Sequence, residues 1–166
     1  MKIDVVDLVS KKASKKKVHL VSNLDNFYDD GEYIEFLQPV TLDGEISISG
    51  NIIGLDGRIT TELKLACSRC LTDFNYNIDF QIHEDFSNKL EDKDDEIIFI
   101  DSDIIDITDI IKNNIIISLP IKKLCKDNCE GLCQICGENL NISSCNCKDD
   151  IIDPRFDKLK DLFSDN

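Results

Sequence analysis

The sequence predicts an α+β fold, in which an antiparallel β-meander or barrel-like body carries one amphipathic helix and a small cysteine-rich, zinc-binding tail ending in a short helix. Apolar and polar residues alternate with a period of two through residues 32–86, as in antiparallel strands with one solvated face. Isoleucines near residues 107–118 follow helical spacing, and six of the eight cysteines come later. We therefore expect residues 1–120 to form the body and residues 121–166 the tail.

Composition limits the classes of function. The chain has 166 residues, 42% of them hydrophobic, which suits one domain or one domain with a small appendage. Its 33 acidic and 19 basic residues give a net charge of −14, which argues against a general nucleic-acid binder. The sequence lacks an apolar run near the roughly 18 residues of a membrane helix, and its acidic start is unlike a signal peptide. A cytoplasmic protein without membrane contact is the expectation.

The amino-terminal residues alternate loosely and predict a strand over residues 1–9. A basic block follows, and two interpretations of it remain open. One is a solvated loop, and the other is a phosphate-binding loop that contacts RNA. The block consists of Lys11, Lys12, Lys15, Lys16 and Lys17.

The alternating region predicts a meander with a hairpin turn at residues 55–58, because an Asp-Gly pair between alternating runs favours such a turn. Two further strands follow, in ITTELKLAC and FNYNIDFQIHEDF. Residues 87–96 are acidic and predict an exposed loop, and the following IIFI predicts a short strand. Four acids of this loop could hold a divalent cation, but they lack the calcium-loop pattern, so a solvated loop is favoured. They are Asp92, Asp94, Asp95 and Glu96.

The spacing of four isoleucines predicts a helix near residues 107–118, although the β-branched run at 115–117 would also suit a strand. Asp103 or Asp106 could cap this helix, and Pro120 would end it. A short terminal helix is predicted after Asp153, which is a suitable N-cap followed by Pro154. Its apolar stripe consists of Phe156, Leu159 and Phe163.

The eight cysteines form four pairs, and a reducing compartment disfavours disulfides, so metal binding explains them better. Four pairs suit two zinc ions with four thiolates each. The first predicted site is Cys133, Cys136, Cys145 and Cys147, and the second is Cys67, Cys70, Cys125 and Cys129. The second would clamp the tail onto the sheet. Cys125 and Cys129 could instead exchange roles with a pair of the first site, or remain free.

Other uses of these cysteines are less favoured. A thioredoxin-type motif would open a helix, whereas Cys67 and Cys70 lie between strand patterns. Ferredoxin spacing is missing. His19 and His83 have no motif around them, and the common catalytic and nucleotide-binding motifs are absent from the sequence. The sequence therefore predicts a protein that is not an enzyme and has no small-molecule substrate.

Several stretches resemble the YceD-like family of bacterial and plastid large ribosomal RNA subunit accumulation proteins. They are EFLQPV, LKLACSRCLTDF, SLPIKKLC, CEGLCQICGENLN, CNC and DPRFDKLKDLF. The resemblance implies a non-enzymatic factor for accumulation or processing of 23S ribosomal RNA and large-subunit biogenesis.

From this we expect a scaffold for a ribosome-assembly or RNA-processing protein, or for ribosomal RNA. Local RNA contact would use the lysine block, helped by Arg58, Arg69, Lys122 and Lys123. The alternative is a zinc-thiolate redox sensor that releases a protein partner on oxidation.

Overall fold

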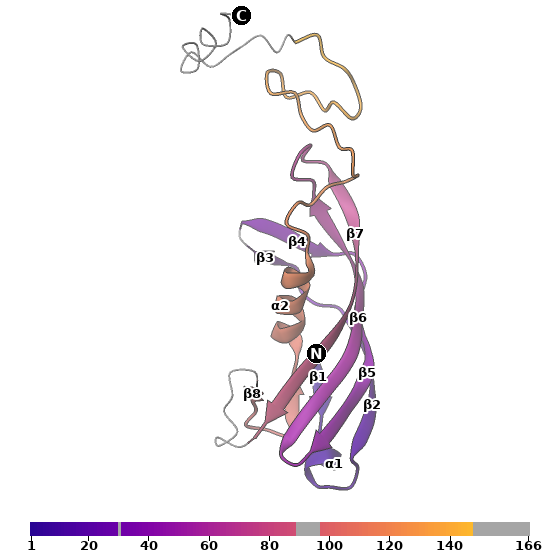
Figure 1. The fold of residues 1–166 in the computed structure, drawn as a ribbon, viewed down its shortest axis with the longest axis vertical. Coiled ribbons are helices and arrows are strands. Elements are labelled where there is room, and N and C mark those ends of the chain that lie inside the picture. Colours follow the sequence, from indigo (N-terminus) through magenta and orange to yellow (C-terminus); the bar gives the residue numbers. More distant parts are fainter. Residues whose placement is uncertain (30, 89–96, 148–166) are drawn as a thin grey trace, which may run out of the picture.

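A computed structural model describes residues 1–29, 31–88 and 97–147 and shows an elongated molecule built on one long sheet (Figure 1). Its elements in chain order are β1 (Lys2–Asp4), α1 (Val6–Val9), β2 (Lys15–Ser22), β3 (Phe27–Asp29), β4 (Glu32–Phe36), β5 (Val40–Ser49), β6 (Ile52–Ala66), β7 (Asp73–Ser87), β8 (Ile97–Phe99), β9 (Ile104–Asp106) and α2 (Thr108–Ser118).

The sheet is organised around β6, a strand of 15 residues. On one side, β7 pairs with β6 along its whole length. On the other side, β5 pairs with the first part of β6, and β4 pairs with it at Glu35–Lys64 and Phe36–Leu63. Strand β2 lies outside β5, β3 lies outside β4, and β8 adds to β7 in the parallel direction. The predicted antiparallel meander is therefore confirmed for β5 to β7, whereas β4 is antiparallel to β6 and, among the described residues, does not pair with its sequence neighbour β5.

The barrel-like closure predicted from the sequence is wrong. In the described ranges β2, β3 and β8 are edge strands that do not pair with one another, so the sheet stays open. Its apolar face is covered instead by α2 and by the two-stranded ribbon of β1 and β9 (Figure 1). Alternation along a strand predicts one buried face but does not distinguish a partner strand from a covering helix.

Helix α2 forms where helical spacing predicted it. Its first-turn neighbour Ile107 and its residues Ile111 and Ile115 are fully buried. They belong to one hydrophobic core with residues from the inner face of the sheet, such as Leu55 and Phe86. Burial of this stripe outweighs the modest strand preference of its β-branched residues.

The hairpin turn predicted at residues 55–58 is wrong. The chain turns at Gly50, whose φ is +65°, between paired residues Ser49 and Ile52, and β6 runs straight through Asp56 and Gly57. Gly57 lies opposite Gly44, where a Cβ atom would be 2.2 Å from the carbonyl oxygen of Asp56. The Asp-Gly pair thus permits close approach of two strands, although the same pair of residues is also the sequence signature of a hairpin turn.

Two amino-terminal predictions also change. The strand predicted over residues 1–9 ends at Asp4 and gives way to the short helix α1. Lys15, Lys16 and Lys17 lie on β2, not in a loop, while Lys11 and Lys12 precede this strand. Backbone pairing of Lys15 with Ser47 draws the second half of the lysine block into the sheet.

Two predictions lie outside the described residues. These are the cation-binding alternative for Asp92, Asp94, Asp95 and Glu96, and the terminal helix with Asp153, Pro154, Phe156, Leu159 and Phe163. The division at residue 120 stays a prediction. None of the helices in the described part of the chain is long and apolar enough to span a membrane.

The N-cap residue of α2 is Ile107, which makes no side-chain cap hydrogen bond, so neither Asp103 nor Asp106 occupies the predicted cap position. We nevertheless expect Asp106→Ala to destabilise the protein by about 1 kcal/mol, the usual contribution of an intramolecular hydrogen bond. The Asp106 carboxylate accepts hydrogen bonds from the hydroxyl and the backbone N–H of Thr108, which lower its pKa to about 2. This contribution is complete above the carboxyl's unfolded pKa of about 3.9 and is lost as the pH falls toward 2. Urea unfolding at pH 7 and pH 2.5 tests this: the two proteins should differ less at the lower pH. Asp101→Ala, another exposed acid nearby, should change little.

Candidate metal centres

Two groups of four cysteines converge in the structure, and within each group all Sγ atoms lie within 4.8 Å of one another. We call Cys67, Cys70, Cys125 and Cys129 the hairpin cluster, and Cys133, Cys136, Cys145 and Cys147 the tail cluster. These are the same two sets that the spacing predicted. The exchange of Cys125 and Cys129 with the other site, which the sequence left open, does not occur in this arrangement.

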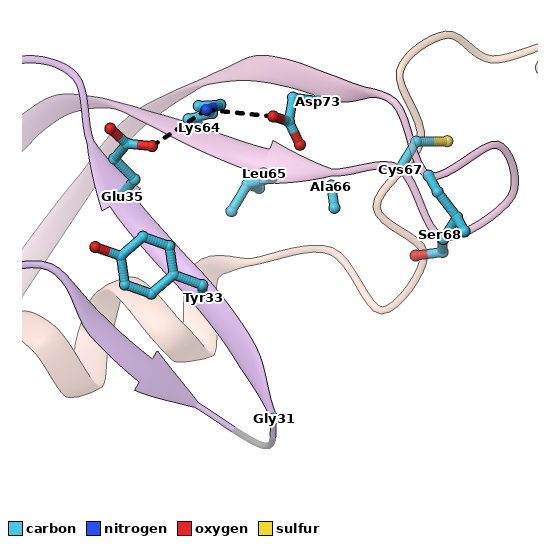
Figure 2. Close-up of a pocket in the computed structure, with 10 residues that line it drawn as sticks. Gly31, Tyr33, Glu35, Lys64, Leu65, Ala66, Cys67, Ser68 and Asp73 are labelled. Atoms are coloured by element: carbon cyan, nitrogen blue, oxygen red, sulfur yellow. Dashed lines mark ion pairs between the residues drawn. The ribbon is translucent and has the colours of Figure 1, made fainter.

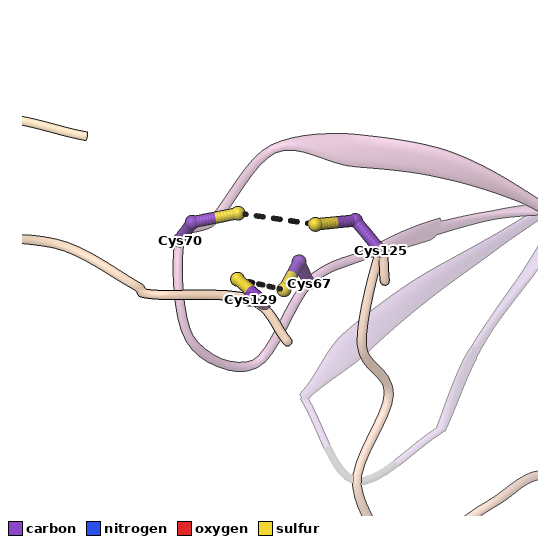
Figure 3. A group of neighbouring side chains, drawn as sticks. All are labelled: Cys67, Cys70, Cys125 and Cys129. Atoms are coloured by element: carbon purple, nitrogen blue, oxygen red, sulfur yellow. Dashed lines mark hydrogen bonds between the residues drawn. The ribbon is translucent and has the colours of Figure 1, made fainter. Parts of the chain in front are cut away.

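The hairpin cluster joins the end of the sheet to the tail (Figure 3). Cys67 and Cys70 belong to the turn between β6 and β7, and Cys125 and Cys129 follow α2. The Sγ atoms of Cys67 and Cys129 are 3.7 Å apart, and those of Cys70 and Cys125 are 3.6 Å apart. Sulfur ligands at 2.3 Å around tetrahedral zinc would be about 3.8 Å apart. The cluster therefore has the dimensions of a four-thiolate zinc site.

The two clusters begin with the same backbone turn. In the hairpin cluster, the N–H of Cys67 donates to the carbonyl of Thr72, and that of Leu71 donates to the carbonyl of Cys67. In the tail cluster, the N–H of Cys133 donates to the carbonyl of Glu138, and that of Gly137 donates to the carbonyl of Cys133. Each turn brings its two cysteine sulfurs together and directs backbone N–H groups of the turn toward the first sulfur. Both therefore have the form of a zinc knuckle.

One residue distinguishes the two turns. Gly137 has a φ of +76°, and the corresponding residue of the hairpin cluster is Leu71, with a φ of +59°. A left-handed backbone costs a non-glycine residue roughly 1–2 kcal/mol. The Leu71 side chain is also 69% exposed, so burial does not offset this cost. The hairpin turn thus holds an exposed leucine in a strained conformation.

The protonation of the sulfurs favours a cation in each cluster. Burial opposes ionisation of Cys67, but backbone N–H groups of Arg69, Cys125 and Cys70 act more strongly together and lower its pKa to about 6. Burial, followed by the neighbouring thiol of Cys70, raises the pKa of Cys125 to about 12. One thiol thus ionises readily while its neighbour resists. A divalent cation would allow all four to ionise together.

The tail cluster shows the same division. Backbone N–H groups of Cys136 and Ile135 lower the pKa of Cys133 to about 6. The Cys136 thiol and burial raise the pKa of Cys147 to about 12. The clusters differ in exposure, however. Cys67, Cys70 and Cys129 are buried, whereas Cys136 is exposed. The tail cluster is therefore the more accessible of the two.

Two asparagines connect the clusters. The side-chain amide of Asn141 donates to the Sγ atom of Cys129 at 3.3 Å, and its carbonyl oxygen accepts the N–H of Glu130. Asn139 accepts the backbone and side-chain N–H groups of Asn141, and its own amide donates to the hydroxyl of Thr72 at 3.1 Å. The loop of the tail cluster thereby supports a sulfur of the hairpin cluster.

Besides the asparagines, the described part of the tail contacts the end of the sheet through a backbone hydrogen bond and a small apolar group. The N–H of Ser68 donates to the carbonyl of Lys123 at 2.7 Å. The buried apolar atoms here come mainly from the cysteines, with Phe74, Leu124 and Leu132 packed against them. This cluster is small, so a metal ion would supply much of the attachment.

The predicted basic residues do not form one patch. The lysine block lies at the end of the sheet opposite the cysteines (Figure 1). Lys15 pairs with Ser47, which pairs with Gly54, and the 13 residues from there to Cys67 span roughly 40 Å of strand. Arg69 and Lys122 are exposed near the hairpin cluster. Arg58 lies between, bound to the carboxylate of Asp79.

Lys15 and Lys16 have partners within the chain. The Nζ atom of Lys15 is 2.7 Å from a carboxylate oxygen of Glu45, and that of Lys16 donates to the carbonyl of Asp4. The histidines pair with carboxylates on the solvated face of the sheet, His19 with Asp43 and His83 with Asp56. His19 and His83 belong to neither cysteine cluster.

Sequence reasoning did not identify Asn139, Asn141 or Leu71. A signal for the asparagines was present, because GENLN follows the second knuckle and places two side-chain amides two residues apart. For Leu71 the signal was the comparison of C-S-R-C-L with C-Q-I-C-G, in which leucine replaces the glycine typical of a left-handed position.

Comparisons with known proteins cover the region that contains both clusters. The family model described as large ribosomal RNA subunit accumulation protein YceD matches residues 55–163. The uncharacterized protein YlbN of Bacillus subtilis (strain 168) is 30% identical over 133 residues, which cover 78% of this chain and 77% of that protein. An uncharacterized protein of Mycobacterium leprae (strain TN) is 26% identical over 136 residues, which cover 79% of this chain and 62% of that protein's length. No solved structure matches the chain.

Proposed function

Because the chain belongs to the YceD family of large ribosomal RNA subunit accumulation proteins, we propose that it is a non-enzymatic zinc protein that supports accumulation of 23S ribosomal RNA. It acts in the cytoplasm, as a scaffold for an assembly or processing partner. The family match carries this proposal, since it covers most of β6, all of β7, the hairpin cluster and the tail as far as residue 163. Two four-cysteine clusters are the principal chemical groups of that region.

We assign one zinc ion to each cluster. Thiolate sulfur is a preferred ligand of zinc, and four cysteines without an open position are typical of structural rather than catalytic sites. The hairpin cluster would hold the tail at the end of the sheet, and the tail cluster would fold the loop that contains Asn139 and Asn141. Both ions then stabilise a surface for a partner.

Asn141→Ala is expected to weaken zinc binding by the hairpin cluster about tenfold or more, the usual effect of losing a group that supports a metal ligand. The variant loses the N–H···S hydrogen bond to Cys129. Competition with a chromogenic zinc chelator measures this affinity in the full chain. Asn77→Ala, on an exposed position of β7, is the matched control and should bind zinc as the natural sequence does. Equal zinc affinities of the Asn141→Ala and Asn77→Ala proteins would refute the supporting role.

Within the lysine block, direct RNA contact is assigned to Lys11, Lys12 and Lys17. Lys15 and Lys16 are engaged by Glu45 and Asp4. These lysines lie at the end of the molecule remote from the cysteines. RNA contact is assigned to this end alone, because the chain as a whole is strongly acidic and would repel phosphates elsewhere.

The test of the proposed function is depletion in cells, followed by gel analysis of mature and precursor ribosomal RNA. We expect the mature large-subunit RNA to fall relative to the small-subunit RNA. The natural sequence should restore it, and a chain with Cys67 and Cys70 replaced by serine should not. Unchanged ribosomal RNA levels after depletion would contradict the proposal.

A second candidate function is a redox sensor, and the exposure of Cys136 in the tail cluster is the observation that favours it. One hydrogen peroxide would take two electrons from two thiolates and two protons from solvent, giving a disulfide and two waters, and zinc would be released because two of its ligands are lost. Retention of zinc and of partner binding under mild peroxide would exclude it.

A further inference from the structure

A groove lies between the β3–β4 hairpin and the knuckle formed by residues 67–70 (Figure 2). Its volume is about 380 Å³. Tyr33 forms one side, Leu65 and Ala66 of β6 form the floor, and Ser68 and Leu71 of the knuckle also line it. The Tyr33 ring contacts the Tyr28 ring at 4.9 Å between centroids, which fixes its position. We call this surface the knuckle groove.

The groove contains an open strand edge. Pairing of β4 with β6 stops at Glu35–Lys64, because β4 continues toward its turn with β3. The carbonyl of Glu62 accepts the N–H of Leu37, so the peptide groups of Glu62 face the β4 side. By the alternation of antiparallel strands, those of Lys64 and Ala66 face the same side. Among the described strands, none pairs with Ala66 there. Lys64 is paired with Glu35, and the N–H of Ser68 donates to the carbonyl of Lys123. The peptide group of Ala66 is therefore the part of this edge at which an added strand can pair.

Leu71 gives independent support for a binding role. It lines the groove, is exposed, and has a left-handed backbone where the tail cluster has Gly137. Glycine would remove the strain, so leucine is unfavourable for the folded chain by itself. Strained residues of this kind concentrate at functional sites. A side chain that contacts a partner explains why a large apolar residue occupies this position.

The charges at the other end of the groove indicate the chemistry of the partner. The Nζ atom of Lys64 lies 3.3 Å from a carboxylate oxygen of Glu35 and 3.2 Å from one of Asp73. One ammonium group therefore faces two carboxylates, and one negative charge is in excess. The net charge of −14 adds to this field. Phosphates would be repelled here, whereas a lysine or arginine would be attracted.

We propose that the knuckle groove binds an extended peptide segment of a partner protein as an additional strand beside Ala66. An apolar side chain of the peptide packs between Tyr33 and Leu71, and a lysine or arginine two residues along the strand, on the same face, pairs with Glu35 and Asp73. This inference rests on the proposed scaffold function and deepens it, because it assigns the protein partner to one surface.

The test is selection from random nine-residue peptides displayed on phage, with the full zinc-loaded chain as bait. We expect an enriched pattern in which a central apolar residue and a lysine or arginine are two positions apart. A fluorescent copy of an enriched peptide then gives the dissociation constant by anisotropy. N-methylation of alternate peptide amides should abolish binding at one parity and spare it at the other, because only alternate amides face β6.

Three variants locate the binding site. Leu71→Asn should raise the dissociation constant of the peptide about tenfold, because asparagine tolerates the left-handed backbone but lacks the apolar side chain. Leu71→Gly should have a similar effect while its melting temperature stays at or above that of the natural sequence. Val21→Ser is the matched control, since Val21 is an exposed apolar residue at the edge strand β2, and it should bind normally.

Several results would overturn the inference. These are failure to enrich any peptide, peptide affinity unchanged by both Leu71 substitutions, or equal effects of N-methylation at both parities. Displacement of the peptide by a twelve-nucleotide uridine RNA would instead identify the groove as a nucleic-acid site. The peptide experiments and the ribosomal RNA levels after depletion are independent measurements. Failure of the groove proposal is therefore distinguishable from failure of the proposed function.

Discussion

Replacing Cys70 with serine is expected to detach the tail from the sheet while the sheet itself remains folded. Cys70 is buried, and its Sγ atom faces that of Cys125 across the hairpin cluster. Serine preserves the shape but removes a thiolate ligand. Apparent binding free energies of structural zinc in small zinc domains are about 10–16 kcal/mol, which exceeds what the few apolar contacts here can supply. The expected effect is therefore that the tail is detached from the sheet in most molecules of the variant.

Limited proteolysis with trypsin measures this change. Lys122, Lys123 and Lys126 lie in the segment that approaches the hairpin cluster, and cleavage there should become rapid in the Cys70→Ser chain. The far-ultraviolet circular dichroism of the sheet should be retained. Cys136→Ser is the matched control, because it removes a ligand of the tail cluster and leaves the hairpin cluster complete. If both variants are cleaved as slowly as the natural sequence, the hairpin cluster does not hold the tail.

Phe86→Ala is expected to lower the free energy of unfolding by about 3–5 kcal/mol. Phe86 is the largest of the fully buried side chains and lies near the end of β7, within the core shared by the sheet and α2. Its removal leaves a cavity that surrounding strands cannot readily fill. Since domains of this size are stable by about 5–15 kcal/mol, much of the total would be lost.

Chemical denaturation followed by circular dichroism gives the measurement. Phe99→Ala is the matched control, because Phe99 is 45% exposed on the edge strand β8 and should change stability far less. Zinc content below the unfolding transition should be the same in both variants. An equal loss of stability in the two would show that the core is not centred on β7 and α2.

The features predicted correctly from the sequence are those with a local chemical cause. The spacing of the cysteines predicted both clusters. In each knuckle, two intervening residues allow two sulfurs to reach one ion. The isoleucine spacing predicted α2, because a spacing of four residues places Ile107, Ile111 and Ile115 on one buried face of a helix. Alternation likewise predicted strands β4 to β7.

The features missed depend on contacts between distant residues. Whether the sheet closes depends on what covers its apolar face, and the covering β1–β9 ribbon joins residues about one hundred positions apart. Asp56 and Gly57 imitate a turn locally, although Gly57 serves close approach to Gly44. The lysine block resembles a loop until its pairing with β5 is known. Local pattern does not carry such information.

The same distinction applies to the candidate site. The ligand sets follow from spacing, but the support of Cys129 by Asn141 and the open edge beside Ala66 arise only when the tail and the β3–β4 hairpin are placed against β6. Leu71 is intermediate, since its strain follows from a local comparison with Gly137 but its exposure does not.

Native mass spectrometry of the full chain, purified without chelator, tests the central claim most directly. The account predicts a mass excess of two zinc ions with all eight thiols reduced. Each of Cys70→Ser and Cys136→Ser should retain a single ion. A natural chain that carries no metal, or variants that each keep both ions, would contradict the assignment of one zinc to each cluster.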